Sequence, residues 1–476
     1  MSLNPRIDIN VRTALSLIPS PGDAIGLLIG TAQYGRTDEI LTYTNFTSVL
    51  SEFQEDYNQN TSIIKGAEAF FANNGSILKV IRIEDGTAEK ANIEIDGESA
   101  TSDVITVEAL NKGAFGNNFM INIDVQGSGR IIRIRSGNNI ELFNNDGDID
   151  GYTTNQAMAD AVNARSNLVN IIVNDNTKLV NNTASFIQLS GGANGSTNIT
   201  SSHYTTAFDN IAENEDWDFL MIPNTKQTIE LENTDAFHTL ITGRIENREN
   251  TLKKYSMYIS GVVQDEVIAD IQARTTASER FVLCAPSIVN TSRVDGAKQI
   301  LDGTYLGCAL AGRLCELDDS GSSSTRKEVM VEDLMVNSTT NKKYYDNPEI
   351  DILLNSRVCI ASRIANGLKY ARGITRIADT TSIYFEINIV RIVDKIKTTI
   401  QNTLDDYLGE PNSTITRTRM EAVVDGILES SQNQGLLNEY LPTVVTTGAS
   451  PDSVNVAIII KPAFSTNFIN VVITIN

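Results

Sequence analysis

The chain has few of the residues on which enzymes and metal proteins most often depend. Its 476 residues include two histidines, His203 and His238, and four cysteines. Ser-His-Asp catalysis needs a histidine held between an acid and an activated serine, and neither histidine lies at the end of a predicted strand. No G-x-S-x-G turn, phosphate-binding loop, G-x-G-x-x-G motif or Cys/His metal spacing occurs. We therefore expect no enzyme activity, no catalytic residue, no cofactor and no metal, and the composition favours a structural role.

The run DGDIDG, from Asp146 to Gly151, resembles the start of a calcium loop. Such a loop has a bidentate Glu at its twelfth position, and this chain has Ala157 there. The aspartates and glycines are better explained as a turn between two strands.

The cysteines occur in apolar contexts such as FVLCAP and LGCALAG, and none forms a C-x-x-C pair. This pattern predicts buried, reduced thiols in a protein made in a reducing compartment. The opening MSLNPRIDIN has no apolar core of a signal peptide, and no apolar run approaches the ~18 residues of a membrane span. We expect a soluble protein that is not exported through a signal peptide and does not insert into a membrane.

Charge of one sign dominates the chain. The formal net charge is −21, with 59 acidic and 38 basic residues. Nucleic acid and anionic membranes attract basic faces, so neither is an expected partner. The length and the 41% hydrophobic content predict two to four domains with ample core.

Hydrophobic patterning predicts a multidomain α/β and α+β fold in five segments. Apolar runs such as AIGLLIGTA, each followed by a helical pattern, indicate strands of a parallel sheet with crossover helices. Short alternating strands with Gly- and Asn-rich turns instead indicate an antiparallel β domain inserted into this α/β chain. The segments are an arm and linker (1–23), the first α/β part (24–90), the inserted β domain (91–200), the second α/β part (201–365) and an α+β domain (366–476).

Both ends of the chain alternate like half-buried strands. Near the start, Ile7, Ile9 and Val11 alternate with polar residues ahead of the breaker IPSPGD. At the end, apolar residues recur at every second position of 469–475. An unpaired apolar strand at a terminus promotes aggregation, so both strands are expected to have partners.

These segments, in this order, resemble the contractile tail sheath protein family of bacteriophages, R-type bacteriocins and related injection machines. The resemblance rests on GLLIGTAQYGRTDEILTYTNFTSVLSEF, AEAFFANNGSILKVIRI, EALNKGAFGNNFMINI, IQLSGGANG, INIVRIVDKIKTTIQ and VNVAIIIKPAFSTNFINVVITI. Leu110 and Asn111 depart from the family's pattern in the third of these.

The resemblance implies a subtilisin-like α/β core without a protease site, with the β domain on the outer surface. It also implies that the terminal strands are exchanged between subunits of a helical sheath, because strand addition pairs an edge with a partner's backbone. The residues assigned to this exchange are Ile7, Ile9, Val11, Phe468, Ile469, Val471, Ile473 and Ile475. The implied partners are identical subunits, an inner tail tube, and baseplate and tail terminator proteins. The implied location is a virion tail or injection particle assembled in the host cytoplasm.

The closing domain carries cations on an otherwise acidic chain. By resemblance this domain lines the sheath lumen, so Arg391, Lys395 and Lys397, on a predicted amphipathic helix, are candidate contacts to an acidic tube. A solvated helix face explains them equally well.

Two other functions fit the sequence. One is another virion or shell component that assembles by strand exchange, and the other is a hydrolase on the same α/β scaffold. Electron microscopy separates them, because a sheath forms long tubes, a shell closes and an enzyme stays monomeric.

Overall fold

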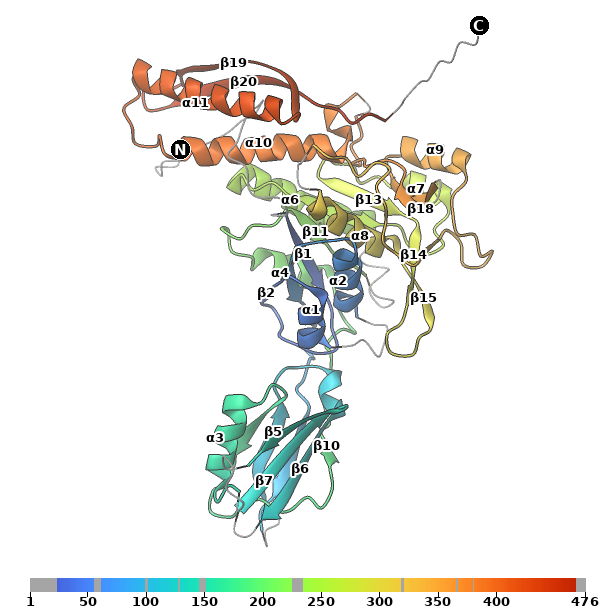
Figure 1. Ribbon diagram of the computed structural model, residues 1–476, viewed down its shortest axis with the longest axis vertical. Coiled ribbons are helices and arrows are strands. Elements are labelled where there is room, and N and C mark those ends of the chain that lie inside the picture. The colour runs from blue at the N-terminus through green and yellow to red at the C-terminus, as the bar shows by residue number, and fades with distance from the viewer. Residues whose placement is uncertain are drawn as a thin grey trace.

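The computed structural model shows an elongated molecule with the β domain and the C-terminal domain at opposite ends (Figure 1). It describes residues 24–54, 61–98, 102–126, 129–144, 151–224, 234–317, 321–364, 367–379 and 381–467.

An eight-stranded sheet forms the centre of the molecule, and both α/β parts of the chain contribute to it. Its strands are β1 (Ile25–Gly30), β2 (Ile40–Tyr43), β3 (Ile77–Arg82), β11 (Phe219–Met221), β12 (Met257–Gly261), β13 (Phe281–Ala285), β17 (Cys359–Ile364) and β18 (Gly367–Tyr370). They lie in the order β18-β17-β13-β12-β11-β1-β3-β2. The inner strands are parallel, and the edge strands β2 and β18 are antiparallel to their neighbours. The predicted parallel α/β sheet is therefore confirmed.

Helices cover both faces of this sheet, which explains why its strands are continuous apolar runs. One face packs against α1 (Phe46–Phe53), α2 (Ile63–Ala72) and α8 (Gly303–Glu316). The other packs against α4 (Ser201–Asp209), α6 (Asp235–Leu252), α7 (Ile268–Ala273) and α9 (Asn347–Asn355). Helices α2 and α8 meet closely at Gly312, where a Cβ would lie 2.1 Å from the carbonyl oxygen of Phe70. The four cysteines are buried in this region, as expected.

A small sheet flanks the central one. It has the order β15-β14-β16, from β14 (Ser287–Thr291), β15 (Lys298–Leu301) and β16 (Asp333–Met335).

The β domain is a sandwich with its own core. One sheet has the order β10-β6-β7-β8 and the other β4-β5-β9. The strands are β4 (Asn92–Asp96), β5 (Asp103–Ala109), β6 (Phe119–Gln126), β7 (Gly129–Ser136), β8 (Asn139–Phe143), β9 (Val169–Val173) and β10 (Ile187–Gln188), with η1 (Ala114–Asn118) and α3 (Asn155–Arg165) between them. Helix α3 buries Met158 and Val162 in this core.

Side-chain contacts join the β domain to the α/β part of the chain, in addition to the two chain segments that connect them. Tyr34, which follows β1, packs with Phe115 and Phe119 of the β domain. The buried guanidinium of Arg82 donates to the carbonyl oxygens of Gly35 and of Lys112, at 2.5 and 2.8 Å, and to that of Asn194 at 3.0 Å. Residues outside the insertion therefore complete the junction.

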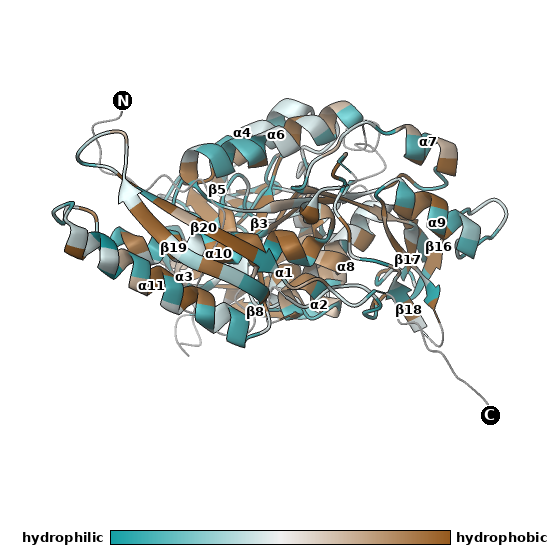
Figure 2. Cartoon of the chain, turned by 90° about the horizontal axis from the view of Figure 1, so that it is seen from above, coloured by the Kyte–Doolittle hydropathy of each residue, from teal (hydrophilic) through white to brown (hydrophobic). Residues whose placement is uncertain are grey.

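The C-terminal domain consists of α10 (Ile387–Asp405), α11 (Thr414–Asn433) and the hairpin of β19 (Leu437–Thr447) and β20 (Val454–Pro462), preceded by η2 (Ile383–Phe385). The apolar stripe of α10 packs with α11 and the hairpin in a separate core. The predicted amphipathic helix is thus confirmed. Seen from above, the hairpin and α11 lie over α10 (Figure 2).

Candidate assembly interface

Helix α10 lies between the hairpin and the α/β domain. Ile389, Ile392 and Ile396 belong to the core shared with α11 and the hairpin. Ile387 and Val390 belong to the core of the α/β domain. Both sides of the helix are therefore packed within the chain.

Two of the three predicted tube-contact cations contact the α/β domain. Arg391 donates through Nη2 to the carbonyl oxygen of Leu317 at 3.3 Å, and its guanidinium lies 5.7 Å from the ring of Phe219. The Nζ of Lys397 lies 2.9 Å from Glu249 Oε1 on α6. Lys395 is half-buried. Because Lys397 is six positions from Arg391, the two side chains leave different sides of α10.

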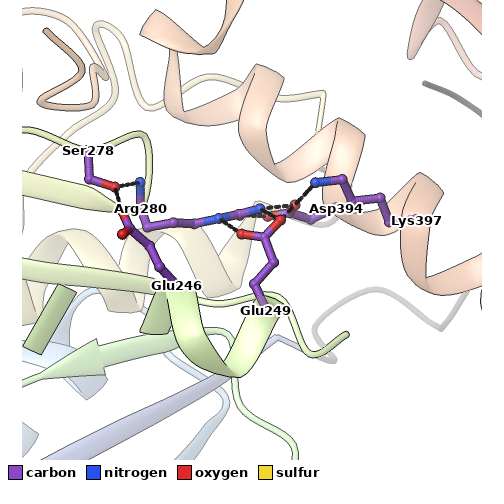
Figure 3. A network of polar contacts seen from close by, with 6 residues as sticks. All are labelled: Glu246, Glu249, Ser278, Arg280, Asp394 and Lys397. Atoms are coloured by element: carbon purple, nitrogen blue, oxygen red, sulfur yellow. Dashed lines mark hydrogen bonds and ion pairs between the residues drawn. The ribbon is translucent and has the colours of Figure 1, made fainter. Parts of the chain in front are cut away.

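Lys397 belongs to a charged network that joins α10 to the α/β domain (Figure 3). Arg280 is at its centre and donates to both carboxylate oxygens of Glu249, through Nε at 2.7 Å and Nη2 at 2.8 Å. It also donates through Nη2 to Asp394 Oδ1 of α10 at 2.8 Å, and Nη1 contacts Oδ2. Ser278, two residues before Arg280, accepts a hydrogen bond from the backbone N–H of Arg280 through its side-chain oxygen.

The surroundings of Arg280 and Glu249 favour the charged form of each side chain. Burial by itself lowers the pKa of Arg280, but the carboxylates of Asp394 and Glu249 outweigh it and raise that pKa. Burial likewise opposes ionisation of Glu249, and Arg280 and Lys397 nevertheless lower its pKa. Arg280 is 1% exposed. A buried pair of this kind fixes the relative position of its elements, because removal of one partner leaves a buried charge uncompensated.

The residues predicted to exchange between subunits lie outside the described residues. They are Ile7, Ile9, Val11, Phe468, Ile469, Val471, Ile473 and Ile475. The described part of the C-terminal domain ends at Asn467, whose Nδ2 donates to Glu386 Oε1 at 2.5 Å. Glu386 is the N-cap residue of α10, so this contact holds the chain at the beginning of that helix.

Comparison with known proteins identifies the C-terminal domain. Residues 379–476 match the family model of the phage tail sheath C-terminal domain. Residues 379–476 are similar to this domain, and we refer to them as the sheath domain.

A longer stretch is similar to one curated protein. Over 244 residues the chain is 25% identical to the tail sheath protein of Bacillus phage SP01, which covers 50% of the chain and 39% of that protein. The chain thus matches about two fifths of the length of this relative.

Two solved structures share the fold over nearly the full length. The sheath tail protein of Desulfitobacterium hafniense has a TM-score of 0.68 at 14% identity, covering 96% of this chain and 99% of that one. The helical sheath of the anti-feeding prophage in its contracted state has a TM-score of 0.56 at 12% identity, covering 100% of both chains. The whole chain, and not only its sheath domain, therefore has the mixed α/β multidomain fold of sheath proteins.

The two histidines of this sheath-type chain have structural roles. His238 on α6 lies with its Nε2 3.2 Å from Ser260 Oγ, but the two residues are 0% and 1% exposed. A substrate cannot reach this pair. His203 accepts the backbone N–H of Thr200 at 2.9 Å in the capping box of α4. The proteins to which the chain is similar are named as a tail sheath protein and a helical sheath.

Other candidate sites are not found in the part of the chain that the structure describes. No group of three or more His, Cys, Asp and Glu side chains there is placed to hold a metal ion. No described helix is both long and apolar enough to cross a membrane. The aspartates at 146–150 lie outside the described residues.

Two elements of the sheath domain, helix α11 and strand β19, were not predicted from the sequence. Leu441 and Val444 of β19, with Ile459 of β20, form an apolar patch on the hairpin face turned away from α10, and Ile459 is 59% exposed. The alternation in YLPTVVTT was the available signal, but Pro442 interrupts it at an irregularity in the register.

Proposed function

We propose that the chain is a structural subunit of a contractile tail sheath, which polymerises helically around an inner tube and shortens to drive that tube through a target envelope. The observation that carries this proposal is the sheath domain at residues 379–476, joined to a sheath-type fold over the rest of the chain. The particle is a phage tail or a related injection machine, assembled in the host cytoplasm.

In this proposal the sheath contracts because its subunits change their packing against one another while each subunit stays rigid. The network around Arg280 and the packing of Ile387 and Val390 into the α/β core support a body that moves as one piece. The terminal strands then connect neighbouring bodies. Each contact joins two different surfaces and does not close on itself, so repetition of one interface builds a tube. The energy is stored in the extended assembly, and nucleotide hydrolysis contributes nothing.

The proposed orientation places the β domain outside and the sheath domain toward the tube. The two lie at opposite ends of the molecule (Figure 1), which supports this arrangement. Because Arg391 and Lys397 contact the chain's own α/β domain, we assign the tube contact to the outward side of the sheath domain, which includes the patch of Leu441, Val444 and Ile459. The subtilisin-like topology of the core and the baseplate and terminator partners remain part of the proposal.

Co-expression with a small tube protein encoded beside this chain, followed by negative-stain electron microscopy, tests the proposed function. We expect hollow tubes with the sheath wrapped around an inner cylinder. Closed shells would instead support the other strand-exchanging virion component. A protein that stays monomeric with the tube protein at high concentration would overturn the sheath proposal.

A further inference from the structure

Two arginines contact one aromatic ring directly ahead of α10. Arg357 follows the C-terminus of α9, and its guanidinium carbon lies 4.1 Å from the ring centre of Phe385 in η2. The guanidinium carbon of Arg372 lies 4.5 Å from the centre of the same ring. Ile383, in the same short helix as Phe385, is 45% exposed. We call these four residues the arginine surface.

The two arginines differ in how their charge is offset. Arg372 donates through Nη2 to Glu386 Oε1 at 2.8 Å. In the part of the chain that the structure describes, no carboxylate pairs with the guanidinium of Arg357 and no acceptor is bonded to it. Burial, and after it the charge of Arg372, lower the pKa of Arg357. One positive charge of the arginine surface is therefore not compensated by a described residue.

The opposite end of α10 carries two carboxylates. Asp405 is the last residue of the helix and Asp406 is its C-cap, and both are exposed. An acidic side chain is unfavourable at a helix C-terminus because the partial charge of the helix there is negative. The last turn of α10 contains no basic residue, and neither carboxylate forms an ion pair with a described side chain. The two charges therefore have no local stabilisation among these residues.

An apolar side chain accompanies the charges at each end. Leu408, three residues beyond Asp405, is 41% exposed, as Ile383 is beside the arginines. Apolar contacts at an interface exclude water and so strengthen the polar contacts that they surround. The two ends of α10 thus match in charge sign and in composition.

The two ends of α10 are too far apart to meet within one subunit. The helix has 19 residues, so at a rise of 1.5 Å per residue its ends are ~28 Å apart. Figure 1 shows α9 near one end of α10 and the turn into α11 at the other. A contact between the ends therefore needs two subunits.

We propose that Asp405 and Asp406 of one subunit dock on the arginine surface of a neighbouring copy and pair there with its Arg357. Charge complementarity selects a second copy as the occupant, since the chain itself presents the matching carboxylates at the far end of the same helix. The contact joins two different surfaces, so it repeats from subunit to subunit and builds an open array. This inference rests on the proposed sheath function and adds an interface made by side chains, independent of the terminal strands.

Exchange of the charges tests the contact in the full chain, co-assembled with its tube protein. Arg357→Glu places like charges opposite each other, so the critical concentration for tube formation should rise about tenfold. Asp405→Arg with Asp406→Arg should have the same effect. The variant with all three changes again has opposite charges across the contact, and its critical concentration should return to within about twofold of the original value. Pelleting over a range of protein concentrations, with electron microscopy of the pellets, measures this quantity.

Two controls accompany the exchange. Arg363 also lies over an aromatic ring, that of Tyr344 at 5.8 Å, and forms no ion pair with a described carboxylate. If Arg363→Glu impairs assembly, Asp405→Arg with Asp406→Arg should not restore it. The same aspartate changes should raise the thermal unfolding midpoint of the monomer, because cations stabilise a helix C-terminus. Calorimetry thereby separates a lost contact from lost folding.

The outcomes separate this inference from the proposed function. If the original chain forms tubes but the triple variant assembles no better than Arg357→Glu, the contact is overturned while the sheath function stands. Rescue of Arg363→Glu by the aspartate changes would show an effect of net charge and would also overturn it. If Arg357→Glu does not fold, Asp405→Asn with Asp406→Asn decides, since unchanged assembly of that variant rejects the contact. An original chain that forms no tubes contradicts the sheath function, and the inference is then rejected with it.

Discussion

Single residues decide how firmly the sheath domain is attached to the rest of the chain. Arg280 lies between Glu249 of α6 and Asp394 of α10, and 114 positions separate it from Asp394 in the sequence. Arg419 also pairs with a carboxylate, that of Glu410, but 57% of its side chain is exposed. The same residue type thus occurs in a buried and in a solvated ion pair, and removal of one partner should reduce stability mainly in the buried pair.

Replacing Arg280 by Met should lower the free energy of unfolding by about 3–5 kcal/mol, because Glu249 and Asp394 lose a buried counter-charge. The matched variant Arg419→Met should change it by less than ~1 kcal/mol. Urea denaturation of the monomer measures both. Since the pKa of Glu249 is lowered from 4.5, the contribution of Glu249 is present above that pH and is lost as the pH falls below it. The effect of Arg280→Met should therefore shrink on acidification, and equal losses in the two variants would contradict this account.

At the scale of elements, the sheath-domain core is closed without the terminal strand. Helices α10 and α11 and the hairpin bury Val424, Leu428, Val445 and Ile458 among the described residues. The last described residues, from Phe464 to Asn467, are exposed or half-buried. Under the proposed function, the strand predicted beyond Asn467 is therefore available to a neighbour.

Deletion of residues 468–476 should leave the thermal unfolding midpoint of the monomer unchanged and abolish tube formation. The deletion begins after Asn467, so the contact with Glu386 is retained. Ile473→Pro is a milder version, since proline removes one backbone donor from the strand, and it should also give a soluble subunit that does not assemble. Differential scanning calorimetry and electron microscopy measure the two properties. Tubes from the truncated chain would refute strand exchange, and an unfolded monomer would show that the strand completes its own subunit's core.

At the scale of the whole molecule, the β domain is an independent core with a shared junction. Its sandwich is filled by its own residues, yet Tyr34 and Arg82 of the α/β part contact it directly. Simple excision would remove two of the acceptors of a buried guanidinium, which costs several kcal/mol when the charge is left unsatisfied.

A chain in which a short linker joins Asp85 to Ser201 should therefore express poorly, whereas the same deletion with Tyr34→Ser and Arg82→Gln should fold and still form tubes. The physical reason is that the outward β domain takes no part in the proposed helical contacts. Circular dichroism establishes folding, and electron microscopy of the folded variant then tests assembly. A folded variant that fails to polymerise would mean that the β domain contributes to the sheath contacts.

The spacing of apolar residues along the sequence was enough to predict where several helices and strands form. Continuous apolar runs became the parallel strands β1, β12 and β13, because a strand covered on both faces needs apolar residues at every position. The stripe along α10 became a buried helix face for the same reason. The shortage of histidine and the ordered family segments pointed to a structural sheath protein before any contact was known.

Only the tertiary structure decided what the polar residues contact. The sequence places Arg391 and Lys397 on one helix, but which element lies opposite each depends on how α10 packs between the hairpin and the α/β domain. It likewise gives no sign that Glu421 and Asp425 of α11 accept hydrogen bonds from the backbone of β19. Apolar burial follows a local pattern that repeats along the chain, whereas an ion pair or a capped edge joins groups that are far apart in sequence and meet only when the chain has folded.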